Sequence, residues 1–237
     1  MSKSPINVLL FSTLFPHEGE PTLGIFVENR LKNLLEHENV KATVIAPVPW
    51  FPFRHKLFGG YARSAKAQVV ETRGELTVYH PRYLVIPKVG MLLTPWFLYR
   101  SAWRVLKKLL DRGEVFDLID AHYFYTDAVA AKRLAAVARL PYIVTARGSD
   151  VTQIALMNKP RKLILSAIQH ASHAITVSAN LRRDLVSMGA CEGKISVLRN
   201  GVDLVRFKET NREAGRQRYP SGKIMLFAGW LIPRKRL

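Results

Sequence analysis

The sequence has 237 residues, enough for one large α/β domain, or for one such domain and part of a second. Lys and Arg total 36 against 18 Asp and Glu, a formal net charge of +18, which predicts an anionic partner: nucleic acid, an anionic membrane leaflet or a phosphorylated substrate. No apolar stretch is long enough to predict a membrane-spanning helix, no cleavage pattern predicts a signal peptide, and the single cysteine, Cys191, excludes an internal disulfide.

The chain begins with the pattern of a βαβ unit. Residues 6–11 are a continuous apolar run, typical of a parallel strand buried on both faces. After a loop rich in Pro and Gly, apolar residues at helical spacing follow Gly24, and residues 41–46 predict a second strand. Residues 47–67 mix aromatic and basic side chains without a period, and we expect them to be irregular.

Two short strands and a long helix complete the first half. Strands are predicted over residues 68–72 and 76–79, and an amphipathic helix over residues 95–112. The apolar face of this helix should carry Trp96, Tyr99, Trp103, Leu106 and Leu110, with Arg100, Arg104 and Lys107 beside it.

The second half alternates strands and helices. Strands are predicted over 118–121, 142–146, 174–177 and 195–198, and helices over 127–139, 159–171 and 180–188. Ser178 is the expected N-cap of the last helix and Gly189 its stop. Such alternation with short loops predicts an α/β fold, a parallel sheet with helices on both faces, whose ligands bind at the carboxyl ends of the strands.

The C-terminal segment changes character. Residues 209–221 are polar and charged, typical of a solvated helix or linker, and residues 223–228 predict a new buried strand. We therefore expect a first domain over 1–203, a linker over 204–222, and the first strand and turn of a truncated second domain over 223–237.

Polar residues follow two of the predicted strands. His122 closes one strand, where a histidine is as often a structural hydrogen-bonding residue as a functional one. Arg147 follows the next strand, and its planar, permanently charged guanidinium suits oxyanions. Gly148 permits a tight turn there, and Asp150 is expected to cap the next helix or to orient Arg147.

Together, these segments resemble glycosyltransferase family 4 in order and spacing. The similarity lies in residues 15–26, 120–122, 145–150, 175–207 and 228–235. Members of this family are retaining enzymes with the GT-B fold, two Rossmann-like domains facing a cleft. The resemblance implies that this chain holds the N-terminal, acceptor-side half of a GT-B fold, with the second domain only begun.

The resemblance also implies roles for individual residues. Gly24 would let a helix N-terminus approach the donor phosphates. His122 and Arg147 would be catalytic, with Arg147 standing where many members carry histidine. The acceptor and cleft residues would be Gly148, Asp150, Ser178 and Asn200. Arg234 and Lys235 would bind the leaving diphosphate, with Trp230 in place of the usual arginine.

The implied activity is sugar transfer from a nucleotide-diphosphate sugar to a glycan or lipid-linked acceptor in cell-surface polysaccharide or glycolipid synthesis. The sugar nucleotide is a co-substrate, and the lack of an Asp-x-Asp motif predicts no metal and no other cofactor. We expect a cytoplasmic location, peripheral at the inner face of the membrane. There, residues 50–63 and 95–112 would meet anionic lipid. The isolated chain is expected to be inactive.

Two alternatives stay open. A non-catalytic Rossmann-like module that binds an anionic glycan or lipid is compatible with every residue. A nucleic-acid-associated protein is favoured by charge alone, without any zinc-finger spacing or RNP-like stretch, and we expect no nucleic-acid partner. The sequence lacks Gly-x-Gly-x-x-Gly after the first strand and a Gly-x-Ser-x-Gly nucleophile turn, which disfavours a dinucleotide-dependent oxidoreductase and a hydrolase.

Overall fold

A computed structural model describes residues 4–50, 60–86, 90–205, 207–208, 212–217, 219 and 222–229. The chain divides into two compact units, Met1–Asn200 and Gly201–Leu237. The domain boundary predicted at residue 203 and the linker over 204–222 stay predictions. Within the described ranges, no helix combines the length and apolar character that a membrane crossing requires.

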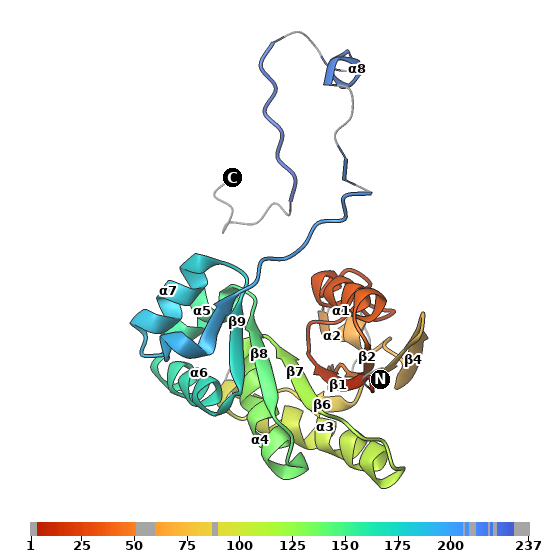
Figure 1. Ribbon diagram of the computed structural model, residues 1–237, viewed down its shortest axis with the longest axis vertical. Coiled ribbons are helices and arrows are strands. Elements are labelled where there is room, and N and C mark those ends of the chain that lie inside the picture. Colours follow the sequence, from red (N-terminus) through yellow and green to blue (C-terminus); the bar gives the residue numbers. More distant parts are fainter. Residues whose placement is uncertain are drawn as a thin grey trace. The chain divides into compact units, whose positions relative to one another are not determined.

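The first unit is built on an eight-stranded sheet (Figure 1). Its strands are β1 (Ile6–Phe11), β2 (Val40–Ile45), β4 (Val70–Arg73), β5 (Leu76–Tyr79), β7 (Leu118–His122), β8 (Tyr142–Ala146), β9 (His173–Thr176) and β10 (Ile195–Val197). The spatial order is β10-β9-β8-β7-β1-β2-β5-β4, and every neighbouring pair is parallel except the β4–β5 hairpin. The predicted α/β fold is confirmed, with one antiparallel strand at an edge.

The segment predicted to be irregular contains regular structure at both of its ends. β3 (Val48–Trp50) pairs in parallel with β6 (Arg82–Leu84) in a second, two-stranded sheet, and α2 spans Gly60–Ser64. The prediction was therefore wrong at these ends, and residues 51–59 lie outside the described ranges. Prolines at 47 and 49 are compatible with β3 because it pairs on one side only.

Helices connect the strands close to the predicted positions. They are α1 (Ile25–His37), α3 (Thr94–Asp111), α4 (Val129–Ala138), α5 (Ser149–Thr152), α6 (Asn158–His170) and α7 (Ala179–Ser187). Short 3-10 turns are η2 (Gly90–Leu92), η4 (Ile154–Leu156) and η5 (Glu192–Lys194), and η3 (Phe124–Ala128) is a π-helical turn before α4. Ser178 caps α7 as predicted, since its hydroxyl accepts a hydrogen bond from the Leu181 amide at 3.3 Å.

Helices cover both faces of the sheet. Alternate residues of β1 enter different hydrophobic clusters: Leu9 and Phe11 pack with α3, whereas Leu10 packs with Val27 and Leu31 of α1. The sheet is therefore buried on both sides, as its apolar strands predict, and polar groups are left to gather at the ends of the strands.

The apolar face predicted for α3 is partly confirmed. Leu106 is buried, and Tyr99, Trp103 and Leu110 are partly buried and pack against the core, whereas Trp96 is 41% exposed. The helix also buries Leu98, Ala102 and Leu109, which the prediction did not include. The helical period was therefore correct, and the buried face is shifted away from Trp96.

The second unit contains one short helix, α8 (Arg212–Arg216). The strand predicted over residues 223–228 is not formed, and Met225 and Leu226 are 98% and 85% exposed. A strand needs a neighbour to pair its backbone N–H and C=O groups, and no described segment pairs with this one.

Candidate functional site

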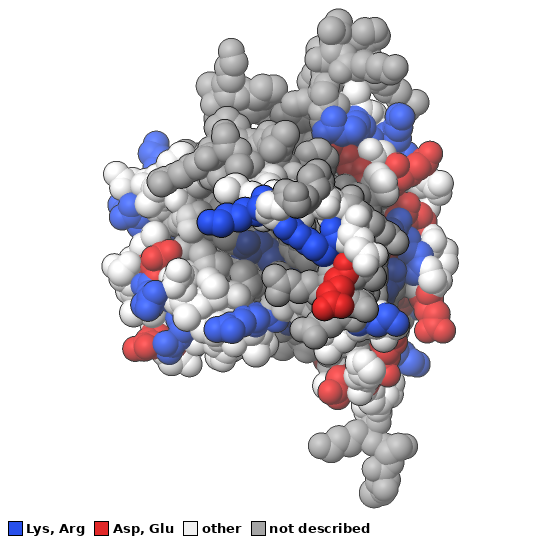
Figure 2. Space-filling view, turned by 90° about the horizontal axis from the view of Figure 1, so that it is seen from above, with Lys and Arg blue, Asp and Glu red and all other residues white. Residues whose placement is uncertain are grey.

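The order of strands places a switch point between β1 and β7. From β1 the chain crosses to β2, on one side, whereas from β7 it crosses to β8, on the other. Ligands of open α/β sheets bind where the two connections diverge, beyond the carboxyl ends of the strands. Figure 2 shows Lys and Arg side chains spread over the side of the molecule seen from above, with Asp and Glu side chains among them. The candidate site is therefore the carboxyl end of β1, β7 and β8.

A row of polar side chains crosses this end of the sheet. His122 Nε2 lies 3.3 Å from Asp120 Oδ2, and His122 Nδ1 lies 2.5 Å from Arg147 Nη2. Arg147 Nη1 then donates to Asn200 Oδ1 at 3.0 Å. Because the guanidinium can only donate, His122 accepts at Nδ1 and carries its proton at Nε2, toward Asp120. The guanidinium group of Arg147 is thus held at both terminal nitrogens, by His122 and by Asn200.

The surroundings keep His122 neutral. The side chain is 1% exposed, so burial lowers its pKa, and the nearby guanidinium of Arg147 lowers it further, against the opposite influence of Asp120. Burial opposes ionisation of Asp120, but the interaction with His122, followed by the charges of Arg30 and Arg147, holds its pKa below the ordinary value. His122 therefore points into the protein and supports Arg147.

Two arginines, Arg147 and Arg30, lie near this row and interact electrostatically. Arg147 stacks on the ring of Phe26, with Cζ 4.9 Å from the ring centroid, and Arg30 of α1 donates to Thr145 Oγ1 at 2.9 Å. Burial, followed by the charge of Arg30, lowers the pKa of Arg147 to about 10, which still leaves it charged at neutral pH. In the described part of the chain, no carboxylate lies within ion-pair distance of either guanidinium. Arg147 Nε is buried without a hydrogen-bond partner.

A second buried acid ties the two sides of the switch point together. Asp127 of η3 accepts hydrogen bonds from the Thr13 amide at 2.6 Å and from the Thr13 hydroxyl at 2.9 Å. Ser12 and Thr126 hydroxyls also donate to it. Burial raises the pKa of Asp127 to about 7, although the hydrogen bonds from Thr13 act in the other direction. Asp127 thereby fixes the loop that leaves β1.

The backbone at Gly24 and at Tyr123 shows how tightly this end is built. Gly24 has φ 61° at the start of α1, and a Cβ there would lie 2.1 Å from the Leu14 carbonyl oxygen. Tyr123, directly after His122, has φ 83°, a strained value for a residue with a side chain. Its hydroxyl lies 2.9 Å from Ser149 Oγ. Strained backbone at the end of a strand is common in functional sites.

Other predicted site residues have structural contacts. Asp150 accepts backbone N–H bonds from Gly148 at 2.7 Å, from Phe124 at 2.8 Å and from Arg147 at 3.1 Å, so it orders the turn that presents Arg147. Gly148, at φ 131°, occupies the turn itself. Ser178 is engaged in capping α7. Their proposed contacts with an acceptor stay predictions.

The predicted diphosphate-binding residues, Arg234 and Lys235, lie outside the described ranges, as does Trp230. Among the described residues, no three His, Cys, Asp or Glu side chains gather as metal ligands would. The roles of Arg234 and Lys235, and the expectation of a metal-free site, therefore stay predictions.

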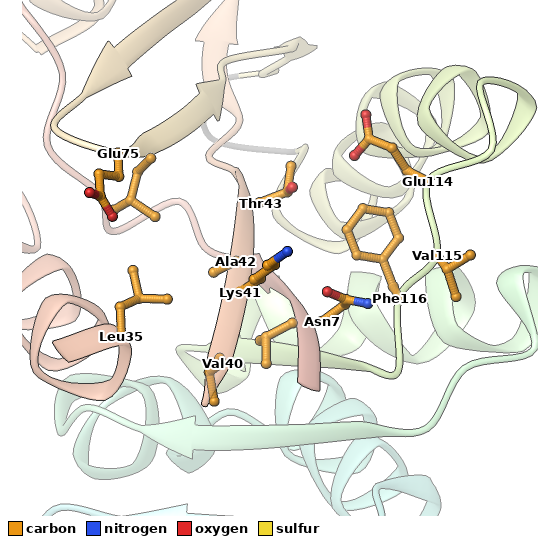
Figure 3. A pocket seen from close by; sticks show the side chains of 12 residues that line it. Asn7, Leu35, Val40, Lys41, Ala42, Thr43, Glu75, Glu114, Val115 and Phe116 are labelled. Atoms are coloured by element: carbon orange, nitrogen blue, oxygen red, sulfur yellow. The ribbon is translucent and has the colours of Figure 1, made fainter. Parts of the chain in front are cut away.

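A hollow lies at the opposite end of the sheet (Figure 3). Its volume is about 470 Å³, and its lining includes Val8, Val40, Ala42 and Leu76, which stand where their strands begin. The lining is mixed, because it also contains the polar or charged residues Asn7, Lys41, Thr43, Glu75 and Glu114. None of the predicted site residues lines it, so volume does not identify the site.

Sequence reasoning missed Arg30, Asp127 and Phe26. Arg30 is one basic residue among many on a helix, and only the packing of α1 places it beside Thr145. Asp127 occupies the start of a predicted helix, where an acid is ordinary. No signal in the sequence distinguishes these residues, because their importance depends on contacts more than 100 residues apart in the chain.

Known proteins with similar sequences identify the family of this chain. The family model described as Glycosyltransferase Family 4 matches residues 29–206. The Bacillus subtilis (strain 168) protein named "Putative teichuronic acid biosynthesis glycosyltransferase TuaC" is 29% identical over 238 residues, which cover 97% of this chain and 60% of that protein.

Solved structures show the same fold. Sucrose-phosphate synthase from Thermosynechococcus elongatus matches with a TM-score of 0.59 at 12% identity, over 91% of this chain and 53% of that one. Anabaena Alr3699/HepE in complex with UDP and glucose matches with a TM-score of 0.54 at 15% identity, over 90% and 49%. The chain thus spans about half the length of GT-B proteins and 60% of the curated relative. With a family model that matches most of its length, this chain belongs to Glycosyltransferase Family 4.

Proposed function

We propose that the chain is the acceptor-side domain of a retaining glycosyltransferase. It would transfer a sugar from a nucleotide-diphosphate sugar to a glycan or lipid-linked acceptor in the synthesis of a cell-surface polysaccharide or glycolipid. The observation that carries this proposal is the pair of guanidinium groups, Arg30 and Arg147, near the switch point without a carboxylate partner within ion-pair distance among the described residues. Two guanidinium groups without a direct ion pair, in a partly buried setting, favour an anionic ligand.

Support comes from the relatives as well as from the site. The Bacillus subtilis relative carries teichuronic acid biosynthesis in its name, and the Anabaena protein was solved with UDP and glucose. The first name agrees with a polysaccharide product and the second with a nucleotide-sugar co-substrate, both of which we propose here for this chain.

The geometry suits the stabilisation of a leaving diphosphate. As the bond between sugar and diphosphate breaks, negative charge develops on the phosphate oxygens, and a fixed positive charge stabilises it without rearrangement. His122, Asn200 and the ring of Phe26 hold Arg147 in place. His122, neutral and buried, acts in this proposal as a positioning residue for Arg147, and Gly24 admits the close approach of a phosphate to α1.

The remaining partners follow from the same proposal. We infer a cytoplasmic protein that acts at the inner face of an anionic membrane, where lipid-linked acceptors are presented. The sugar nucleotide is a co-substrate, no metal takes part, and no nucleic acid is bound.

Calorimetric titration of the chain with UDP-glucose tests this proposal. Binding should weaken at least about tenfold in Arg147→Ala, and less in Arg147→Lys, because lysine keeps the charge but loses the planar fork. Lys41→Ala, at the other end of the sheet, is the matched control and should bind as the wild type does. Equal affinity for UDP-glucose in the wild type and in the three variants would contradict the proposal. Binding of duplex DNA in preference to UDP-glucose would also contradict it.

The same two arginines favour one alternative, a module that binds an anionic glycan without catalysis. Radiolabelled sugar nucleotides supplied with lipid-linked acceptors distinguish the two. Transfer that depends on Arg147 supports the enzyme, whereas Arg147-dependent binding without transfer, in a protein of the full family length, supports the module.

A further inference from the structure

Aromatic and basic side chains surround a second hollow, away from the switch point. It has a volume of about 340 Å³ and lies among β3, β6 and the first half of α3. Trp50, Leu84, Trp96, Phe97, Arg100 and Arg104 are among its lining residues. Among the described residues, no acidic side chain lines it. We call these six residues, together with Leu92 and Leu93, the aromatic–arginine surface.

The apolar members of this surface are unusually exposed. Trp50 is 48% exposed, Trp96 41% and Leu84 38%. Leu92 and Leu93, which lie in η2 and directly before α3, are 40% and 52% exposed and precede Trp96 by four and three residues. Single exposed apolar residues need no explanation, but a contiguous group beside a hollow indicates a contact surface.

Basic side chains follow Trp96 along α3, at Arg100 and Arg104. The guanidinium carbon of Arg100 lies 5.3 Å from the Trp96 ring centroid, and Arg104 follows at the next turn. Arg82 is engaged elsewhere, because its Nη atoms donate to the Ser64 and Ala67 carbonyls. Within the described residues, Arg100 and Arg104 form no ion pair. Their charges are therefore directed at solvent.

The opposite side of α3 is fixed in the core by Leu98, Ala102, Leu106 and Leu109. The exposed side thus has a defined order, from Leu92 and Leu93 through Trp96 to Arg100 and Arg104. That order is typical of a helix lying at a membrane interface, where apolar side chains enter the boundary of the acyl chains and cations meet lipid phosphates.

We propose that the aromatic–arginine surface docks this chain on an anionic lipid bilayer. This proposal rests on the membrane partner inferred above and names the surface that would contact the membrane. Of the predicted contact residues 95–112, it keeps only the first turns of α3, and it adds the ends of β3 and β6. Charge complementarity selects an anionic bilayer, and the exposed Leu92, Leu93 and Trp96 give the apolar contact that a soluble phosphate would not need.

Sedimentation with vesicles tests the proposal. The wild type should bind vesicles that contain phosphatidylglycerol, bind pure phosphatidylcholine far less, and lose affinity as salt rises. Arg100→Glu combined with Arg104→Glu should weaken binding by at least about 30-fold, because each basic side chain near an anionic leaflet contributes roughly a fivefold factor. The matched control is Lys159→Glu with Lys162→Glu on α6, two exposed positions with the same change in net charge, which should bind nearly as the wild type does.

A second variant separates insertion from charge attraction. Leu92→Ser with Leu93→Ser keeps every charge and should still lose binding several-fold, together with the quenching of tryptophan fluorescence by brominated lipid. Unchanged circular dichroism and UDP-glucose affinity show that each variant is folded.

The outcomes are distinct. A wild type that ignores anionic vesicles overturns the membrane partner, whereas wild-type binding that persists in both surface variants overturns this surface alone. If soluble glycerol phosphate binds with the same dependence on Arg100 and Arg104, and vesicles bind no better, the surface is an ion site and docking is overturned. None of these results depends on sugar transfer, so the proposed activity is tested separately.

Discussion

The two ends of the sheet differ in what they bury. At the carboxyl end, Asp120, His122, Asp127 and Asp150 are all 5% exposed or less, and hydrogen bonds hold each of them. At the amino end, the hollow of Figure 3 has a volume of about 470 Å³, but its Lys41 and Glu75 side chains are exposed to solvent. Burying ionisable groups costs free energy, and a chain keeps such groups where they serve a site. Buried ionisable groups, and not the presence of a hollow, therefore identify the functional end.

Glycines at the two ends offer the strongest contrast. Gly24 and Gly74 share a left-handed backbone, with φ 61° and 62°, but a Cβ would meet Leu14 backbone only at Gly24. Gly74→Ala should cost about 1–2 kcal/mol, the cost of that backbone conformation in a residue with a side chain. Gly24→Ala should cost about 2–5 kcal/mol, because the steric clash adds to it. Urea unfolding of both variants measures the difference, and equal losses would show that α1 can shift away from Leu14.

The hydrogen bonds of Asp127 give the next largest effect. Asp127→Ala leaves the Thr13 amide without its partner and should destabilise the fold by about 1–3 kcal/mol. Asp127→Asn keeps one acceptor and should cost less. Denaturant titration gives both values, and an Ala variant as stable as Asn would mean that water replaces the carboxylate.

The pH dependence of stability should differ between wild type and Asp127→Asn. The pKa of Asp127, about 7 in the folded protein against an ordinary value of 3.8, means that the folded state holds the proton more tightly. The stability that Asp127 contributes is fully present below pH 3.8 and is lost as pH rises toward 7. The free energy of unfolding of the wild type should therefore fall over this window relative to Asp127→Asn. A constant difference between the two proteins would contradict the raised pKa.

Charge removal at the amino end should have the smallest effect. Glu75→Gln changes an exposed side chain and should alter stability by less than about 0.5 kcal/mol, with no effect on UDP-glucose affinity. A larger loss of stability, or a loss of UDP-glucose affinity, would mean that the side chains at the amino end of the sheet also contribute to the fold or to binding.

Local patterns were sufficient to predict the sheet. The apolar run of β1, the serine cap of α7 and the alternation from β7 to β10 follow from short-range chemistry, so their positions agree with the structure within a few residues. His122 and Arg147 were predicted because they stand at the ends of recognisable strands, and the structure brings them into contact.

Features that depend on tertiary packing were not predictable. The exact buried face of α3 depends on tertiary packing, which buries Leu98, Ala102 and Leu109 and leaves Trp96 exposed, although Leu106 is buried as predicted. β3 depends on pairing with β6, more than 30 residues later in the chain. Arg30 and Asp127 gain their importance only from partners on distant elements.

Chemical-shift mapping of the chain with UDP-glucose tests the central claim most directly, that the carboxyl end of the sheet is the binding end. The account predicts that the amides of Thr13, Tyr123 and Gly148 shift on titration, that those of Val8, Ala42 and Leu76 at the hollow of Figure 3 do not, and that Arg147→Ala abolishes the shifts. Shifts confined to Val8, Ala42 and Leu76, or a response at Thr13 and Gly148 that is unchanged without Arg147, would contradict it.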